Sequence, residues 1–175
     1  MRKRSTSRFA NGIISALIVC FFIVHGLMGS LSSVFSLSSA AAWVVWVGMV
    51  FVAAHVVVSI VTSYQQMTDA EFPPSPRKKR HLVLKWTTGG LLLVMAGVHI
   101  ACMRLFGVEA AQSSITAAIV TVALAAVLAT HVCVGAKSLL TDLELSKGFM
   151  KPLRVVVIVL VVVISCATLI ALAGI

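Results

Sequence analysis

The sequence predicts an all-α integral membrane protein, a bundle of five transmembrane helices. Three observations lead to this prediction: 60% of the 175 residues are hydrophobic, only 11% are charged, and the apolar residues fall into five long runs. A soluble domain carries about twice that charged fraction, and each run approaches the roughly 20 residues that cross a bilayer. Because a backbone inside lipid must satisfy its own hydrogen bonds, each run is expected to be a helix.

The expected spans are 12–35, 40–63, 82–106, 114–140 and 153–175, in a single membrane domain that covers 1–175. The first run is too long for a signal peptide, and four more spans follow it. The longest connection, 64–81, contains EFPPSPRKKRH, and its three prolines are expected to keep it extended. Short connections predict that successive helices are antiparallel neighbours.

The basic residues predict the orientation of the chain. Thirteen of the fourteen Lys and Arg lie before the first span, or in and directly beside the connections between the second and third spans and between the fourth and fifth, and Arg104 is the exception. Loops rich in Lys and Arg stay in the cytoplasm, so we expect a multi-pass protein of the inner (cytoplasmic) membrane with its N-terminus inside and its C-terminus outside. This asymmetry explains the net charge of +9 without a nucleic-acid partner. The basic loops suit anionic lipid or an acidic cytoplasmic partner.

Four of the five histidines lie one to each of the first four spans: His25, His55, His99 and His131. The fifth, His81, falls in the basic connection, where an imidazole needs no special explanation. Ionisable residues within a membrane are costly and usually face the bundle interior. At a rise of about 1.5 Å per residue, His25 and His99 share an outer level and His55 and His131 an inner level, on the order of 10–15 Å apart.

Paired imidazoles at two depths are the arrangement for two haems with bis-histidine ligation. Each haem iron takes an axial ligand on either face of the ring, so the ligands come from different helices. A hydrogen bond between helices or a proton relay remains the alternative for any single histidine. Zinc or copper is disfavoured, because the pairs are too far apart to share one ion and neither a carboxylate nor a close cysteine completes a pair.

The order of these motifs resembles the two-haem cytochrome b subunit of fumarate reductases and succinate dehydrogenases, in the form where one polypeptide makes the whole anchor. NGIISALIVCFFIVHGLMGS resembles the first helix of that family, AHVVVSIVTSYQQ the second, WTTGGLLLVMAGVH the third and HVCVGAKSLL the fourth. The resemblance covers most of the chain. It implies two haem b groups, ligated by the pairs His25/His99 and His55/His131.

The resemblance also implies partners. An iron–sulfur subunit and an FAD flavoprotein would dock on the cytoplasmic side, and a dimer of the whole complex is compatible with the family. Electrons would pass between a membrane quinone, menaquinone by family analogy, and a dicarboxylate. The chain would have no catalytic residues of its own and would serve as the electron-transfer and quinone-binding subunit of an oxidoreductase.

The sequence departs from the family where quinone chemistry is concerned. The stretch 29–43 contains no Asp or Glu, although described members place a carboxylate there for quinol deprotonation. Glu109 is the only acid expected on the outer side, and an ordinary loop residue is the favoured interpretation. The quinone site is therefore not located by the sequence.

Haem propionates are anionic and need cationic or polar partners near the membrane surface. Snorkelling towards headgroups is an equally good explanation for the lysines. Arg104 is the candidate for the outer haem, because it is the cation that breaks the charge asymmetry. The remaining candidates for propionate or polar contacts are Lys137, Asn11 and Lys85 for the inner haem, and Ser30.

Two alternatives remain open. The first is a cytochrome b subunit of another membrane dehydrogenase, such as a formate dehydrogenase or hydrogenase, in which one helix usually supplies two of the histidines. The second is a haem-free small transporter or structural membrane protein with incidental histidines, which predicts no visible chromophore and no soluble partners.

Overall fold

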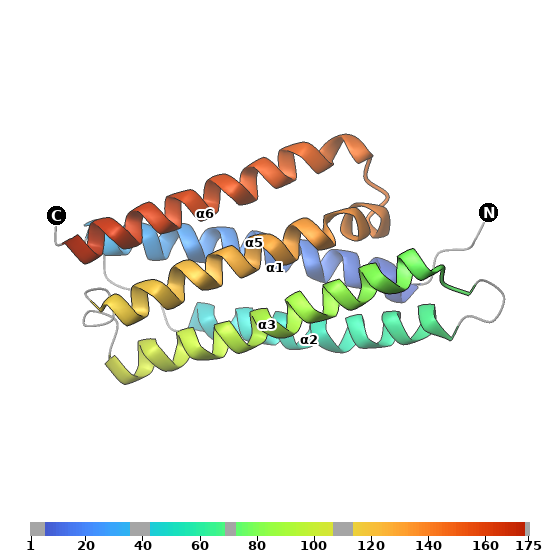
Figure 1. The fold of residues 1–175 in the computed structure, drawn as a ribbon, viewed down its shortest axis with the longest axis horizontal. Coiled ribbons are helices and arrows are strands. Elements are labelled where there is room, and N and C mark those ends of the chain that lie inside the picture. Colours follow the sequence, from blue (N-terminus) through green and yellow to red (C-terminus); the bar gives the residue numbers. More distant parts are fainter. Residues whose placement is uncertain (1–5, 36–42, 69–72, 107–113, 174–175) are drawn as a thin grey trace.

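The computed structural model describes residues 6–35, 43–68, 73–106 and 114–173, which form an antiparallel helical bundle without strands (Figure 1). The helices are α1 (Thr6–Phe35), α2 (Trp43–Met67), α3 (Pro76–Phe106), α5 (Ile115–Asp142) and α6 (Met150–Ala173), with a 3-10 turn, η1 (Lys147–Phe149), before α6. All five contain a segment of at least 21 residues that is long and apolar enough to cross a membrane. The prediction of an all-α, five-span protein is confirmed for the described part of the chain.

One end of the bundle gathers most of the described cations, and we name it the basic end. It is the end where α1, α3 and α6 begin and where α2 and α5 finish (Figure 1). Arg104 lies at the opposite end, in the last turn of α3. The expectation that the basic end faces the cytoplasm remains a prediction from the distribution of Lys and Arg.

The connection between α2 and α3 is shorter than the predicted 64–81. α2 continues to Met67 and α3 begins at Pro76, so the basic run 77–81 is helical. Ser75 caps α3: its Oγ accepts the backbone N–H of Lys78 at 3.3 Å, and its carbonyl accepts that of Lys79 at 3.0 Å. Proline is favoured at a first helical position, because its missing N–H would have no partner there. Pro76 therefore starts a helix in a segment where the three prolines were expected to prevent one.

The central helix is α5, which lies along α3 and α6 and also contacts α1. Small side chains allow helix backbones to approach closely, which favours helix association in lipid. Gly26 shows the same principle where α1 crosses α6, since a Cβ there would lie 2.8 Å from Cδ1 of Ile164. The small buried residues of α5 are Ala117, Ala118, Ala125 and Ala136.

The helices α2 and α3 are successive in sequence but do not pack along each other. α2 lies along α1, and α3 lies along α5. A bridge between the two is the Trp86 indole, whose Nε1–H donates to Ser63 Oγ at 3.2 Å near the basic end. The expectation that every successive pair packs as neighbours is therefore wrong for α2 and α3. The four helices that carry the intramembrane histidines are joined through α1 and α5.

The end of α5 is a Schellman turn that leaves Asp142 in the last helical position. The N–H of Leu145 donates to the carbonyl of Leu140 at 2.8 Å, and the N–H of Glu144 donates to that of Thr141 at 3.3 Å. Glu144 has a φ of 58°, in the left-handed region that this motif usually fills with glycine. The turn stops the helix so that the Asp142 side chain faces α1.

Candidate functional site

His131 on α5 faces Thr88 and Gly89 on α3. Thr88 Oγ1 lies 3.0 Å from Nδ1 of His131 and 2.9 Å from the carbonyl oxygen of Leu84. A carbonyl has no proton to give, so when the hydroxyl donates to Leu84 it is placed to accept from an Nδ1–H of the imidazole. In that tautomer of His131, Nε2 keeps its lone pair. Gly89 makes room for the ring, because a Cβ there would lie 3.1 Å from Cε1.

His55 on α2 is held in the same way by α1. Ser15 Oγ lies 3.1 Å from Nδ1 of His55 and donates to the carbonyl of Asn11 at 2.7 Å. The Ser15 hydroxyl is thus also an acceptor for an Nδ1–H group. Ser59, one turn after His55, donates to Oδ1 of Asn11 at 2.9 Å and lies within 3.5 Å of the ring nitrogens. Asn11 is 6% exposed, so it anchors a buried polar network around His55.

The two remaining histidines lie further from the basic end. Thr121 Oγ1 on α5 lies 3.4 Å from Nδ1 of His99 and donates to the carbonyl of Ala117 at 2.8 Å, which repeats the pattern seen at His131 and His55. His25 on α1 is held by an aromatic contact instead. Its ring stacks on Phe21, with a centroid distance of 5.8 Å and an interplanar angle of 5°.

The hydroxyl contacts measure how far apart the two histidine levels are. On α1, Ser15 contacts the inner-level His55 and lies ten residues before the outer-level His25. On α3, Thr88 contacts the inner-level His131 and lies eleven residues before the outer-level His99. On α5, Thr121 contacts the outer-level His99 and lies ten residues before the inner-level His131. At 1.5 Å per residue, three separate helices place the levels about 15 Å apart.

The structure brings the histidines together in the pairs that the sequence predicted. His99 lies within electrostatic range of His25, and His55 lies within range of His131. Each pair joins two helices that are not consecutive: α1 with α3 at the outer level, and α2 with α5 at the inner level. Whether these pairs ligate haem remains a prediction.

A buried charged cluster lies between the inner level and the basic end. Arg8 donates from Nε and Nη2 to Oδ1 of Asp142 at 3.0 and 2.8 Å, and the Asp142 side chain is 5% exposed. Ser138 donates to the other carboxylate oxygen at 3.4 Å, and Lys85 Nζ donates to Ser138 Oγ at 3.4 Å. Within the described residues, this cluster contains two cations and one carboxylate, which suits a further anionic group. Lys85 also interacts electrostatically with both inner histidines.

The candidates for propionate contacts separate into different places. Asn11 and Lys85 lie beside the inner pair, as described above. Lys137 lines a groove on the surface of the bundle, between α3, α5 and α6. Arg104 is exposed in the last turn of α3. Ser30 belongs to α1, but its side chain lies outside the described part of the structure, and Glu109 and residues 36–42 lie outside it as well.

The hydroxyls that orient the histidines and the pair Arg8 and Asp142 were not predicted from the sequence. A signal for the pair was present, because Asp142 is the only acidic residue within the described helices. An acid inside a membrane span is expected to have a partner. The hydroxyls carried a weaker signal, since serine and threonine are ordinary in membrane helices.

The arrangement suits a macrocycle better than a bare metal ion. No three His, Cys, Asp or Glu side chains of the described residues converge where a metal ion could bind. A haem needs fewer protein ligands than a bare metal ion, because its ring nitrogens surround the iron and one imidazole on each face completes the coordination. Gly135, one turn after His131, is only partly exposed, and a Cβ there would meet nothing within 4 Å.

Comparisons of this chain with protein-family models, with curated proteins and with solved structures find no match. The fold and the site by themselves define a class: a five-helix bundle of membrane-spanning character with paired histidines at two levels. The resemblance to the cytochrome b anchors remains a prediction from the sequence.

Proposed function

We propose that this chain is a dihaem cytochrome b membrane anchor of the fumarate reductase or succinate dehydrogenase type. The observation that carries the proposal is the set of hydroxyls that lie beside Nδ1 of His55, His99 and His131, where each is placed to accept from an Nδ1–H. A proton on Nδ1 leaves Nε2 unprotonated, which is the form of imidazole that binds a metal. A ligating histidine almost always donates its other ring N–H to a polar partner.

In this proposal, His25 and His99 are the axial ligands of the outer haem, and His55 and His131 those of the inner haem. Bound haem supplies a one-electron couple at each level. Ser15, Thr88 and Thr121 fix ring orientation and make the imidazoles more basic ligands.

The cluster at the basic end supports the same assignment. Within the described residues its two cations share one carboxylate, and Lys85 interacts electrostatically with both inner histidines. A haem propionate directed at Lys85 would form a charge-assisted hydrogen bond. Asn11, on α1, offers a neutral partner.

The proposed electron path runs between a membrane quinone, menaquinone by family analogy, and iron–sulfur and FAD flavoprotein subunits at the basic end. Exposed cations in the first turns of α3 suit an acidic partner surface there. They are Arg77, Lys78, Lys79 and Arg80.

The test is a reduced-minus-oxidised visible spectrum of the protein, purified from cells able to supply haem, with haem quantified per polypeptide. We expect two low-spin b haems per chain. His81→Ala is the matched control, because this exposed histidine belongs to neither pair, and it should retain both haems. A colourless wild-type protein would refute the proposal and favour the haem-free transporter or structural alternative.

The pairing has its own test. His25→Ala and His99→Ala should each remove the outer haem and keep the inner one. His55→Ala and His131→Ala should do the converse. Loss of the same haem from His25→Ala and His131→Ala would contradict the pairs.

A further inference from the structure

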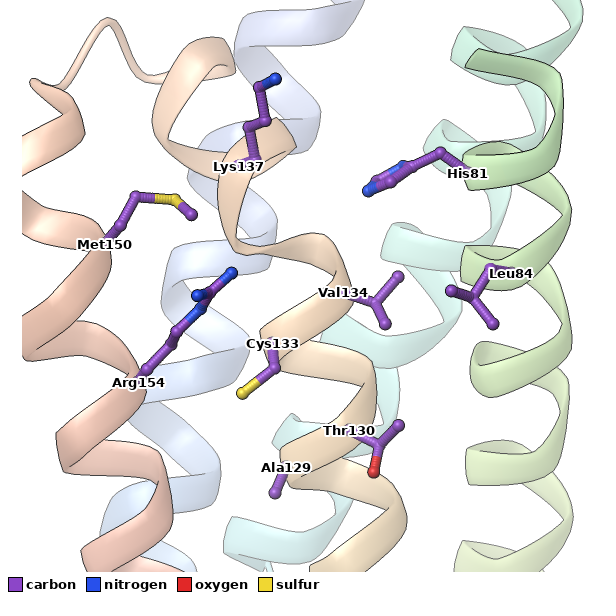
Figure 2. Close-up of a pocket in the computed structure, with 9 residues that line it drawn as sticks. All are labelled: His81, Leu84, Ala129, Thr130, Cys133, Val134, Lys137, Met150 and Arg154. Atoms are coloured by element: carbon purple, nitrogen blue, oxygen red, sulfur yellow. The ribbon is translucent and has the colours of Figure 1, made fainter. Parts of the chain in front are cut away.

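A groove of about 570 Å³ lies on the surface of the bundle between α3, α5 and α6, near the basic end (Figure 2). It is separate from the histidine site. His131 meets Thr88 on the side of α5 that faces α3, whereas the groove follows the side between α3 and α6. Neither histidine pair contributes to its lining.

Three basic side chains border the groove, and each comes from a different helix. In Figure 2, His81 reaches from α3 towards α5, Arg154 reaches from α6 towards α5, and Lys137 stands on α5 itself, further towards the basic end. All three are exposed. Within the described residues none of them has a carboxylate partner, in contrast to Arg8, whose guanidinium is paired with Asp142.

The wall of the groove below these cations is largely apolar. Leu84 on α3 and Cys133 and Val134 on α5 line it, and it continues along α5 to Ala129, away from the basic end (Figure 2). The groove thus has basic side chains towards the basic end and an apolar stretch that continues along the membrane-spanning part of α5. Its shape and charge match an amphiphile with an anionic head.

We propose that this groove binds an anionic phospholipid of the leaflet at the basic end. The headgroup phosphate lies among His81, Lys137 and Arg154, and an acyl chain lies along Leu84 and Val134. Guanidinium and ammonium groups make charge-assisted bonds to phosphate, and basic pockets between membrane helices are suited to anionic headgroups. Cations that only snorkel do not need a shared groove, and a neutral quinone would leave the two cations, Lys137 and Arg154, unused.

This inference does not depend on haem. It requires only that the bundle is in a membrane, so the apoprotein and the holoprotein are expected to bind lipid alike. Failure of the haem proposal and failure of the lipid proposal are therefore distinguishable: the first is read in the visible spectrum, and the second in lipid binding.

The experiment measures binding of phosphatidylglycerol to the purified full chain by native mass spectrometry and by the shift of its unfolding temperature. Phosphatidylcholine and inorganic phosphate serve as the second and third probes. We expect phosphatidylglycerol to bind and to raise the unfolding temperature, and the other two to do neither at equal concentration. The double variant Lys137→Gln/Arg154→Gln should bind it roughly 30-fold more weakly, at about fivefold for each cation removed.

The matched control is Lys79→Gln/Lys151→Gln, which removes the same charge from exposed positions on α3 and α6 outside the groove. It should bind phosphatidylglycerol as the wild type does. An equal loss in both double variants would overturn the proposal, because the cations would then act through general surface charge. Equal binding of phosphatidylcholine would also overturn the proposal. So would binding of a quinone in the groove that does not depend on the cations. Binding of inorganic phosphate alone would overturn it as well, because the cations would then bind a free anion and not a lipid.

A second measurement uses the unaltered chain, in case the double variant does not fold. Phosphatidylglycerol with a photoreactive acyl chain should label the α5 peptide 129–137 and the facing turn of α3 near Leu84. Labelling spread evenly around the bundle, without enrichment in these segments, would refute the site.

Discussion

The hydroxyl of Thr88 offers the sharpest test of the histidine site. Thr88→Val keeps the shape of the side chain but removes the acceptor that lies 3.0 Å from Nδ1 of His131, at a position that is 9% exposed. A buried donor without a partner costs about 1–3 kcal/mol. Loss of a partner to a metal-ligating histidine costs about 10–100-fold in affinity, or about 1.4–2.7 kcal/mol. Both arguments lead to the same magnitude.

The expected result is that Thr88→Val loses the inner haem about 10–100-fold faster to a haem-scavenging globin. The outer haem should be released at the wild-type rate, since its level is about 15 Å away. Thr88→Ser, which keeps the hydroxyl, should restore retention. In the apoprotein, nitrogen NMR of the imidazoles should show the His131 proton on Nδ1.

Thr87→Val is the matched control. Thr87 is the neighbouring residue on α3, it is exposed, and its hydroxyl donates to the carbonyl of Val83 at 3.0 Å. It should release both haems at the wild-type rate. Equal effects of Thr87→Val and Thr88→Val, or equal loss of both haems from Thr88→Val, would refute the reasoning.

Three further predictions concern stability. Arg8→Gln should lower the free energy of unfolding by about 3 kcal/mol, because it removes the guanidinium that makes two hydrogen bonds to the buried Asp142 carboxylate, and chemical unfolding in detergent measures this. Gly48→Ala should cost about 1–3 kcal/mol in the same assay, because its Cβ would overlap the ring of Phe21. Glu144→Gly should raise the free energy by about 1 kcal/mol, because glycine adopts a φ of 58° without strain.

Each of these has a control. Arg80→Gln removes an exposed cation at the same end of the bundle and should change stability by less than about 0.5 kcal/mol. Gly90→Ala places a Cβ where nothing lies within 4 Å, so in the apoprotein it should be neutral or stabilising by up to about 1 kcal/mol. Stability of Arg8→Gln equal to that of Arg80→Gln, or of Gly48→Ala equal to that of Gly90→Ala, would show that the contacts contribute little. An unchanged or lower free energy in Glu144→Gly would contradict the strain argument.

The spans were predictable because they depend on the length and composition of local segments. The start of α3 was not, although Ser75 and Pro76 have the chemistry of a helix N-terminus. A proline can end one helix or begin another, and the local sequence of the connection did not decide between the two. The sparse contact between α2 and α3 was equally unpredictable, since a short connection limits distance without specifying which helices pack.

The levels of the histidines could be read from the sequence for a physical reason. Rise along a helix is constant at about 1.5 Å per residue, so depth follows from position in the chain. Rotation of each helix about its axis is set by its neighbours, and it decides what each imidazole touches. That is why the depths of His55 and His131 were expected, whereas Ser15 and Thr88 as their partners were not.

The sequence by itself determined the number of spans, the charge asymmetry and the two histidine depths, because each is a property measured along one helix at a time. Tertiary structure alone decided the roles of the lysines. Lys85 joins Arg8 and Asp142 in a buried cluster, whereas Lys137 lines a groove on the surface of the bundle with residues of α3 and α6. These contacts join helices far apart in the chain, and only their rotation and packing determine which lysine faces the interior and which faces the lipid.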